Sequence, residues 1–124
     1  MEDFQLKRTE SGRHFEHIDI GCGMHVSIQA GEGAYSTPRI THPSSDEYSE
    51  FEVALMLFDQ FYHPHINPDF AERSWASYWS QYDEVASYMP RAEVGLMLSD
   101  LRRLWKPGFR ARHYNTFSQK FTPS

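Results

Sequence analysis

The stretch that decides the fold lies between residues 17 and 29 and reads His17-Ile-Asp-Ile-Gly-Cys-Gly-Met-His-Val-Ser-Ile-Gln29. Apolar and polar residues alternate on both sides of a glycine-flanked turn at residues 21–23, which is the pattern of two half-buried strands joined in a hairpin. One face of this hairpin is predicted to be core and the other polar. A three-residue loop would set four pairs of residues opposite each other, namely Ile20 and Met24, Asp19 and His25, Ile18 and Val26, and His17 and Ser27.

The rest of the pattern predicts an α+β fold. Residues 47–58 alternate in the same way, which favours a strand, although their large apolar residues also fit one face of a helix. Another strand is predicted near residues 84–89, and Pro90 is suited to open a helix over residues 90–105 with one apolar stripe. We therefore expect an antiparallel sheet of about four strands packed by this C-terminal helix, with strands near residues 14–20, 24–30, 47–58 and 84–89.

An aromatic segment separates the last two predicted strands. Asn67-Pro68 is typical of a helix N-cap followed by proline, and aromatic residues then recur at helical spacing, so we expect a short aromatic helix inserted there. Residues 61–82 hold seven aromatic residues, more than one short helix needs for its buried stripe. Trp75, Tyr78 and Trp79 therefore have two interpretations. They pack in the core, which is the commoner case, or they anchor a partner, because Tyr and Trp dominate binding hot spots.

The length of 124 residues fits one domain. We assign residues 1–105 to a single α+β domain and residues 106–124 to a basic C-terminal tail. No apolar run reaches the roughly 18 residues that span a bilayer, and the first residues lack the basic-then-apolar order of a secretory signal. The one cysteine, Cys22, cannot form a disulfide within the chain. These features predict a cytoplasmic protein with no membrane partner.

Charge is segregated along the chain. Residues 1–100 hold six basic and all seventeen acidic residues, a net charge of −11, whereas residues 101–124 hold six basic residues and no acidic one. Such an asymmetry indicates binding partners before it indicates chemistry. Four carboxylates fall within residues 46–52, and a strand there would put Glu50 and Glu52 on one outward face. These two residues could mimic phosphates toward a basic nucleic-acid groove, or simply keep a strand edge soluble, which is commoner.

The basic end of the chain offers an alternative function. Its cations alternate with aromatic residues and could contact nucleic-acid phosphates through Arg102, Arg103, Lys106, Arg110 and Arg112. The competing interpretation is positive charge that suits a helix C-terminus, followed by a solvated tail.

The polar face of the hairpin gathers His17, Asp19, His25 and Ser27. Asp19 opposite His25 would favour the imidazolium form, and two histidines with a carboxylate could bind a metal. Cys22 and His25 could in the same way form a nucleophile and its base. A solvated sheet face and a small turn cysteine are the commoner interpretations, so we expect no metal, no cofactor and no catalytic residue.

Short segments between residues 26 and 94 carry a resemblance: Val26-Ser-Ile-Gln-Ala-Gly-Glu-Gly-Ala-Tyr-Ser-Thr-Pro-Arg39, Glu52-Val53-Ala54, Tyr88-Met89-Pro90 and Glu93-Val94. In these the chain resembles small phage-encoded proteins of unknown function, and it departs from them over residues 59–83. The resemblance implies a phage accessory protein and transfers no catalytic residue. Because small acidic phage proteins of this size include anti-CRISPR proteins, that analogy raises one function above the others.

We therefore expect a non-enzymatic phage protein that binds a host defence protein or nucleoprotein complex, such as a CRISPR surveillance complex, in the host cytoplasm. Glu50 and Glu52 with the aromatic residues Trp75, Tyr78 and Trp79 are the predicted contacts. A nucleic-acid-binding accessory protein that uses the basic tail is the alternative. Self-association into a homodimer through the aromatic segment is a further one.

Overall fold

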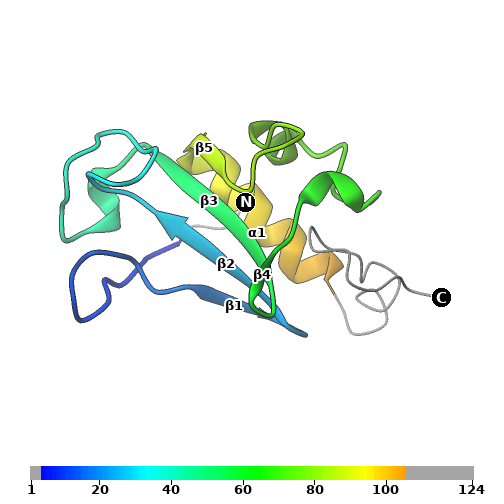
Figure 1. Cartoon of the computed structure of the whole chain (residues 1–124), viewed down its shortest axis with the longest axis horizontal. Helices are drawn as coiled ribbons and strands as arrows, with labels where there is room; N and C mark the ends of the chain where they lie inside the picture. Colours follow the sequence, from blue (N-terminus) through cyan, green and yellow to red (C-terminus); the bar gives the residue numbers. More distant parts are fainter. Residues whose placement is uncertain (1–3, 106–124) are drawn as a thin grey trace.

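The fold is an antiparallel sheet with one α-helix packed against it, as the sequence predicts. The computed structural model describes residues 4–105. Its strands are β1 (Ile18–Gly21), β2 (Met24–Gln29), β3 (Glu50–Leu57), β4 (Gln60–Phe61) and β5 (Ala86–Pro90), and α1 (Arg91–Leu104) follows the last of them directly (Figure 1). The strand order is β1-β2-β3, and both β4 and β5 pair with β3.

The β1–β2 hairpin closes through a loop of two residues. Cys22 and Gly23 both have positive φ, 52° and 85°, which is the conformation that a two-residue hairpin loop requires. The predicted pairs of Ile18 with Val26 and of Asp19 with His25 are confirmed. The predicted pair of Ile20 with Met24 is wrong, because the shorter loop puts Gly21 opposite Met24 and leaves Ile20 in a bulge.

β3 is the central strand of the sheet. It pairs with β2 from Leu57, opposite Met24, to Glu52, opposite Gln29, so residues 47–58 contain a strand and not a helix. β5 and β4 share the other edge of β3, with β5 toward its start and β4 at its end. The two-residue β4 was not predicted, since so short a strand shows no alternation.

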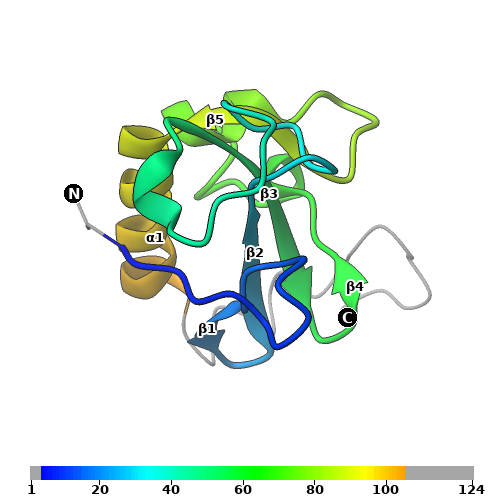
Figure 2. The same ribbon diagram turned by 90° about the vertical axis from the view of Figure 1, so that its left-hand side faces the viewer.

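α1 covers one face of the sheet and forms the core with it (Figure 2). The helix begins after Pro90, as predicted, and its apolar stripe is buried at Val94, Met97, Leu98 and Leu101. Within residues 4–105, no helix has both the length and the apolar character needed to cross a membrane.

The aromatic segment does not form the predicted α-helix. Its helical pieces in the described chain are two 3₁₀ turns, η2 (Pro64–Ile66) and η3 (Ser74–Tyr78). Oδ1 of Asn67 accepts the backbone N–H of Asp69 (2.9 Å), and the Asn67 amide donates to the hydroxyl of Tyr62 (3.1 Å). The buried Asn67 therefore holds a tight turn instead of capping a long helix.

Arg8 ties the N-terminal segment to the long loop after β2. Its guanidinium donates to the carbonyl oxygens of Ala30 (3.2 Å) and His42 (2.7 Å) and to the Tyr48 hydroxyl (3.0 Å). It also lies 3.9 Å from the centre of the Phe15 ring. One side chain thus joins the N-terminal segment to both ends of the loop that follows β2.

Candidate partner-binding site

The face of the sheet opposite α1 is hollowed. Three adjoining hollows lie along it, with volumes of about 360, 730 and 380 Å³. The first two share His14, Gln29 and Glu52, and the second and third share His17. We call these three neighbouring hollows together the open-face groove. Its floor consists of the strand residues that alternate with the core residues, namely His25, Ser27, Gln29, Glu52, Ala54 and Met56.

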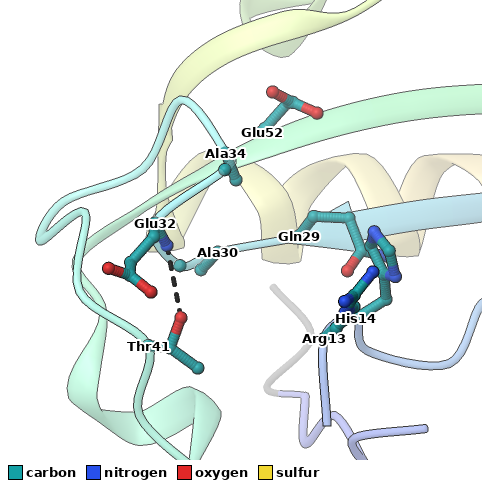
Figure 3. Close-up of a pocket in the computed structure, with 10 residues that line it drawn as sticks. Arg13, His14, Gln29, Ala30, Glu32, Ala34, Thr41 and Glu52 are labelled. Carbon is teal, nitrogen blue, oxygen red and sulfur yellow. Dashed lines mark hydrogen bonds between the residues drawn. The ribbon is translucent and has the colours of Figure 1, made fainter. Parts of the chain in front are cut away.

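The open-face groove is acidic. Among residues 4–105, five carboxylates and a single arginine line it: Glu16, Asp19, Glu32, Glu52 and Asp59, with Arg13. With the histidines neutral, one positive and five negative charges give this described lining a net charge of −4. Figure 3 shows the first hollow, where Glu32 and Glu52 lie apart from Arg13 and His14. This lining favours a cationic group over an anionic one.

A buried glutamine on the floor of the groove holds one of its walls in place. Oε1 of Gln29 accepts the backbone N–H of Phe15 (2.7 Å), and its Nε2 donates to the Phe15 carbonyl oxygen (2.9 Å). Nε2 also donates to the hydroxyl of Ser27 (3.0 Å). The Gln29 side chain thus satisfies the backbone of Phe15 as a neighbouring strand would. This contact holds Glu16 and His17 beside β2, where they line the groove.

Two histidines meet where the second and third hollows join. Nδ1 of His17 lies 2.8 Å from Nδ1 of His25, and Nε2 of His25 lies 2.7 Å from the carbonyl oxygen of Phe58. Because a carbonyl oxygen only accepts, neutral His25 carries its proton on Nε2, and its Nδ1 accepts from His17. Burial, followed by the proximity of His25 and His14, lowers the pKa of His17 from its usual 6.5.

The polar cluster of the hairpin differs from the predicted one. The carboxylate of Asp19 accepts the backbone N–H of Gly21 (2.9 Å), while His25 bonds to His17 and Phe58. The predicted contact between Asp19 and His25 is therefore replaced by a pair of histidines, while the Asp19 carboxylate bonds to the backbone of its own turn. Among the described residues, no group of three or more His, Cys, Asp or Glu side chains could hold a metal ion.

Glu50 and Glu52 lie on the same face of β3 and are both partly exposed. Oε1 of Glu52 accepts the backbone N–H of Tyr35 (3.1 Å), and Oε1 of Glu50 accepts the hydroxyl of Thr37 (2.6 Å). The loop after β2 thus orients both carboxylates. Of the two residues, Glu52 lines the groove, and Glu50 lies beyond its end.

Trp75 and Trp79 are core residues. Their side chains are 0% and 1% exposed, since η3 packs against α1 and β5. The indole N–H of Trp75 donates to Oδ2 of Asp100 on α1 (2.8 Å), whereas that of Trp79 has no hydrogen-bond partner in residues 4–105. Tyr78 is half-buried. Neither tryptophan is accessible to a partner in this conformation. Of the two interpretations of these residues, core packing therefore holds here and use as surface anchors does not.

Phe58, in the third hollow, is an exposed aromatic residue, and Tyr35 and Tyr88 form an exposed aromatic pair next to Glu52. The two tyrosine side chains are 46% and 38% exposed, and their ring centroids are 6.0 Å apart. Sequence reasoning missed both tyrosines. Tyr35 lies in a loop with no periodicity, and Tyr88 lies in a strand whose bulge no alternation reveals.

The residues of the nucleic-acid alternative are described only in part. Arg102 and Arg103 are exposed on the last turn of α1, and Arg103 forms an ion pair with Asp100 (2.8 Å). Lys106, Arg110 and Arg112 lie outside the described residues.

No known protein family, curated protein sequence or solved structure matches this chain. Function is therefore inferred from the open-face groove and its surroundings.

Proposed function

We propose that this chain is a non-enzymatic binding protein that holds a basic segment of a partner protein in the open-face groove. The observation that carries the proposal is the lining of three neighbouring hollows by five carboxylates and one arginine from residues 4–105. Opposite charges attract more strongly in a hollow, where water is partly excluded, than on an open surface. A segment that contains arginine or lysine is therefore the ligand that suits this groove best.

The dimensions of the groove suit an extended segment. The four residue steps along β2 from His25 to Gln29 span about 13 Å. The hollows continue past both of these residues, to Gly33 at one end and Asp59 at the other. Because an extended chain advances about 3.3 Å per residue, about four to six residues would fit.

For the partner we propose a host defence nucleoprotein, such as a CRISPR surveillance complex in the host cytoplasm. The nucleic-acid site of such a complex is basic, since it neutralises phosphates, and it would present the charge that the groove attracts. The protein would then act as an inhibitor that covers this site. Glu52 keeps its predicted role, with Glu50 beside it, and Glu16 and Glu32 replace the two tryptophans as contacts.

Fluorescence anisotropy with a labelled six-residue peptide of alternating arginine and glycine tests the groove. The double variant Glu16→Gln, Glu52→Gln removes two carboxylates from the lining. Each ion pair at such exposed or partly exposed carboxylates contributes about 0.2–1 kcal/mol, so affinity should fall by about 2- to 30-fold. The effect should shrink as salt is added.

The double variant Glu47→Gln, Glu72→Gln is the matched control. It changes the net charge by the same amount at exposed sites away from the groove, so binding should stay within about twofold of wild type. If this control weakens binding as much as the groove variant, only the overall charge matters and the proposal fails. Binding of duplex DNA that needs Arg102 and Arg103 but is unaffected by the groove variant would favour the nucleic-acid alternative.

The inhibitory role has its own assay. A gel shift of target DNA with a purified surveillance complex should weaken when the wild-type protein or the control variant is added. The groove variant should restore the shift. Full inhibition by the groove variant would contradict a role for Glu16 and Glu52 at that interface.

A further inference from the structure

An exposed aromatic cluster borders the open-face groove. Tyr35 follows β2 in the chain, Tyr88 belongs to β5, and the guanidinium of Arg39 lies 5.3 Å from the centre of the Tyr35 ring. We call these three residues the aromatic corner. Figure 2 shows the loop after β2 running beside β5, which is how residues so distant in the sequence meet.

Backbone hydrogen bonds join the aromatic corner to the groove. The N–H of Tyr88 donates to the carbonyl oxygen of Tyr35 (3.0 Å), and the N–H of Tyr35 donates to Oε1 of Glu52 (3.1 Å). Glu52 lines the first two hollows. A segment that reaches Glu52 in the groove therefore lies next to the loop and the strand that carry the two tyrosines.

The backbone conformation of Tyr88 is unfavourable for its residue type. Its φ is +54°, a value that glycine or asparagine adopts far more readily than an aromatic residue. The pairing of β3 with β5 jumps at Glu52, which leaves Ser87 and Tyr88 in a bulge opposite it. Bulges re-aim side chains, and here the ring faces Tyr35 and solvent. Strain retained at an exposed ring points to a role for that ring.

The aromatic corner has the chemistry of a guanidinium site. Tyr35 already carries the guanidinium of Arg39, which donates from Nε to the carbonyl oxygen of Ala34 (3.0 Å). In the described part of the chain, no cation lies over the ring of Tyr88. A planar, weakly hydrated guanidinium stacks on such a ring and donates in its own plane, whereas a lysine ammonium is compact and strongly hydrated.

We propose that the aromatic corner makes the open-face groove selective for arginine over lysine. An arginine of the bound segment would stack on Tyr88 and donate to the carboxylate of Glu52. The inference rests on the proposed function, because it names the residue type that the groove prefers in its basic ligand. Tyr88 and Tyr35 are then the residues that determine specificity, and the other carboxylates serve either cation.

Two labelled six-residue peptides that differ only in carrying arginine or lysine test this inference by fluorescence anisotropy. Wild type should bind the arginine peptide about 2- to 5-fold more tightly, the effect of one exposed cation–π contact. Tyr88→Asn removes the ring and tolerates positive φ, so it should bring the two affinities together. Tyr88→Phe keeps the ring and should keep the preference. Tyr35→Leu changes a residue outside the bulge and should also reduce the preference for arginine. This variant tests the inference if Tyr88→Asn does not fold.

The possible failures are distinguishable. If wild type binds both peptides equally, while Glu16→Gln with Glu52→Gln still weakens both, the inference is overturned and the proposed function stands. The inference is also overturned if Tyr88→Asn and Tyr35→Leu, where they fold, keep the wild-type preference for arginine. If neither peptide binds wild type, the proposed function falls, and this inference falls with it.

Discussion

Two single substitutions in the aromatic segment, Trp75→Phe and Trp79→Phe, should have very different effects on stability. Both rings are buried, and each change replaces an indole by a phenyl, so the cost of lost volume is similar. The difference lies at the indole nitrogen. The N–H of Trp75 donates to Asp100 at 2.8 Å, whereas that of Trp79 has no hydrogen-bond partner within residues 4–105.

The magnitude follows from these two nitrogen environments. A hydrogen bond to a charged acceptor contributes about 1.5–3 kcal/mol, and a buried donor without a partner costs about 1–3 kcal/mol. Trp75→Phe loses a hydrogen bond to a charged acceptor, and Trp79→Phe removes a buried donor without a partner. Asp100 keeps its ion pair with Arg103 after the change, which limits the loss. The free energy of unfolding should therefore be lower in Trp75→Phe than in Trp79→Phe by at least about 2 kcal/mol.

Urea unfolding followed by circular dichroism measures this difference, provided that the m-values agree. Tyr82→Phe is the control, since Tyr82 is an aromatic residue of the same segment that is 86% exposed, and its change should stay within about 0.5 kcal/mol. Equal destabilisation by the two tryptophan variants would refute the reasoning from the indole nitrogens. If neither variant is less stable than the control, the burial of both rings is refuted.

Two further predictions concern the hairpin and its histidines. Gly23→Ala should destabilise the protein by about 2 kcal/mol, because φ is +85° there and the new Cβ would lie 2.7 Å from the Phe58 ring. Gly33→Ala meets nothing within 4 Å and should cost nothing or stabilise by about 0.4–1 kcal/mol; equal urea midpoints for the two variants would contradict this. The pKa of His17 is lowered in the folded state, so folding favours the neutral imidazole. The stability that results is complete above pH 6.5, the usual pKa of histidine, and is lost as pH falls below that value. Wild type should thus lose more stability than His17→Gln between about pH 7.5 and 5.5, and parallel pH profiles would show that burial of His17 beside His25 has no such effect.

The strands and the final helix are predictable because their signals are local. Alternation marks β2 and β3, and proline at the start of α1 with an apolar stripe marks the helix. The aromatic segment misled the same reasoning. Its spacing fits a helix, but Asn67 uses its side chain on Asp69 and Tyr62, and packing against α1 and β5 decides the path.

Only part of the site follows from local signals. A strand pattern suffices to put Glu50 and Glu52 on one face of β3. That pattern does not predict the other carboxylates of the groove. Glu16 lies there because Gln29 contacts Phe15, and Asp59 lies there because of the turn between β3 and β4. These contacts join residues that no short sequence pattern relates.

The sequence by itself determined the α+β class, the hairpin, the apolar stripe of α1 and the excess of acid before residue 101. Each of these depends on residue type and on neighbours a few positions away. Tertiary structure alone decided that Trp75 and Trp79 are buried, that five carboxylates line one groove, and that Tyr88 meets Tyr35 at its end. The physical reason is that burial, shared charge and ring contacts arise between segments far apart in the chain, and the packing of the whole sheet and helix sets their distances.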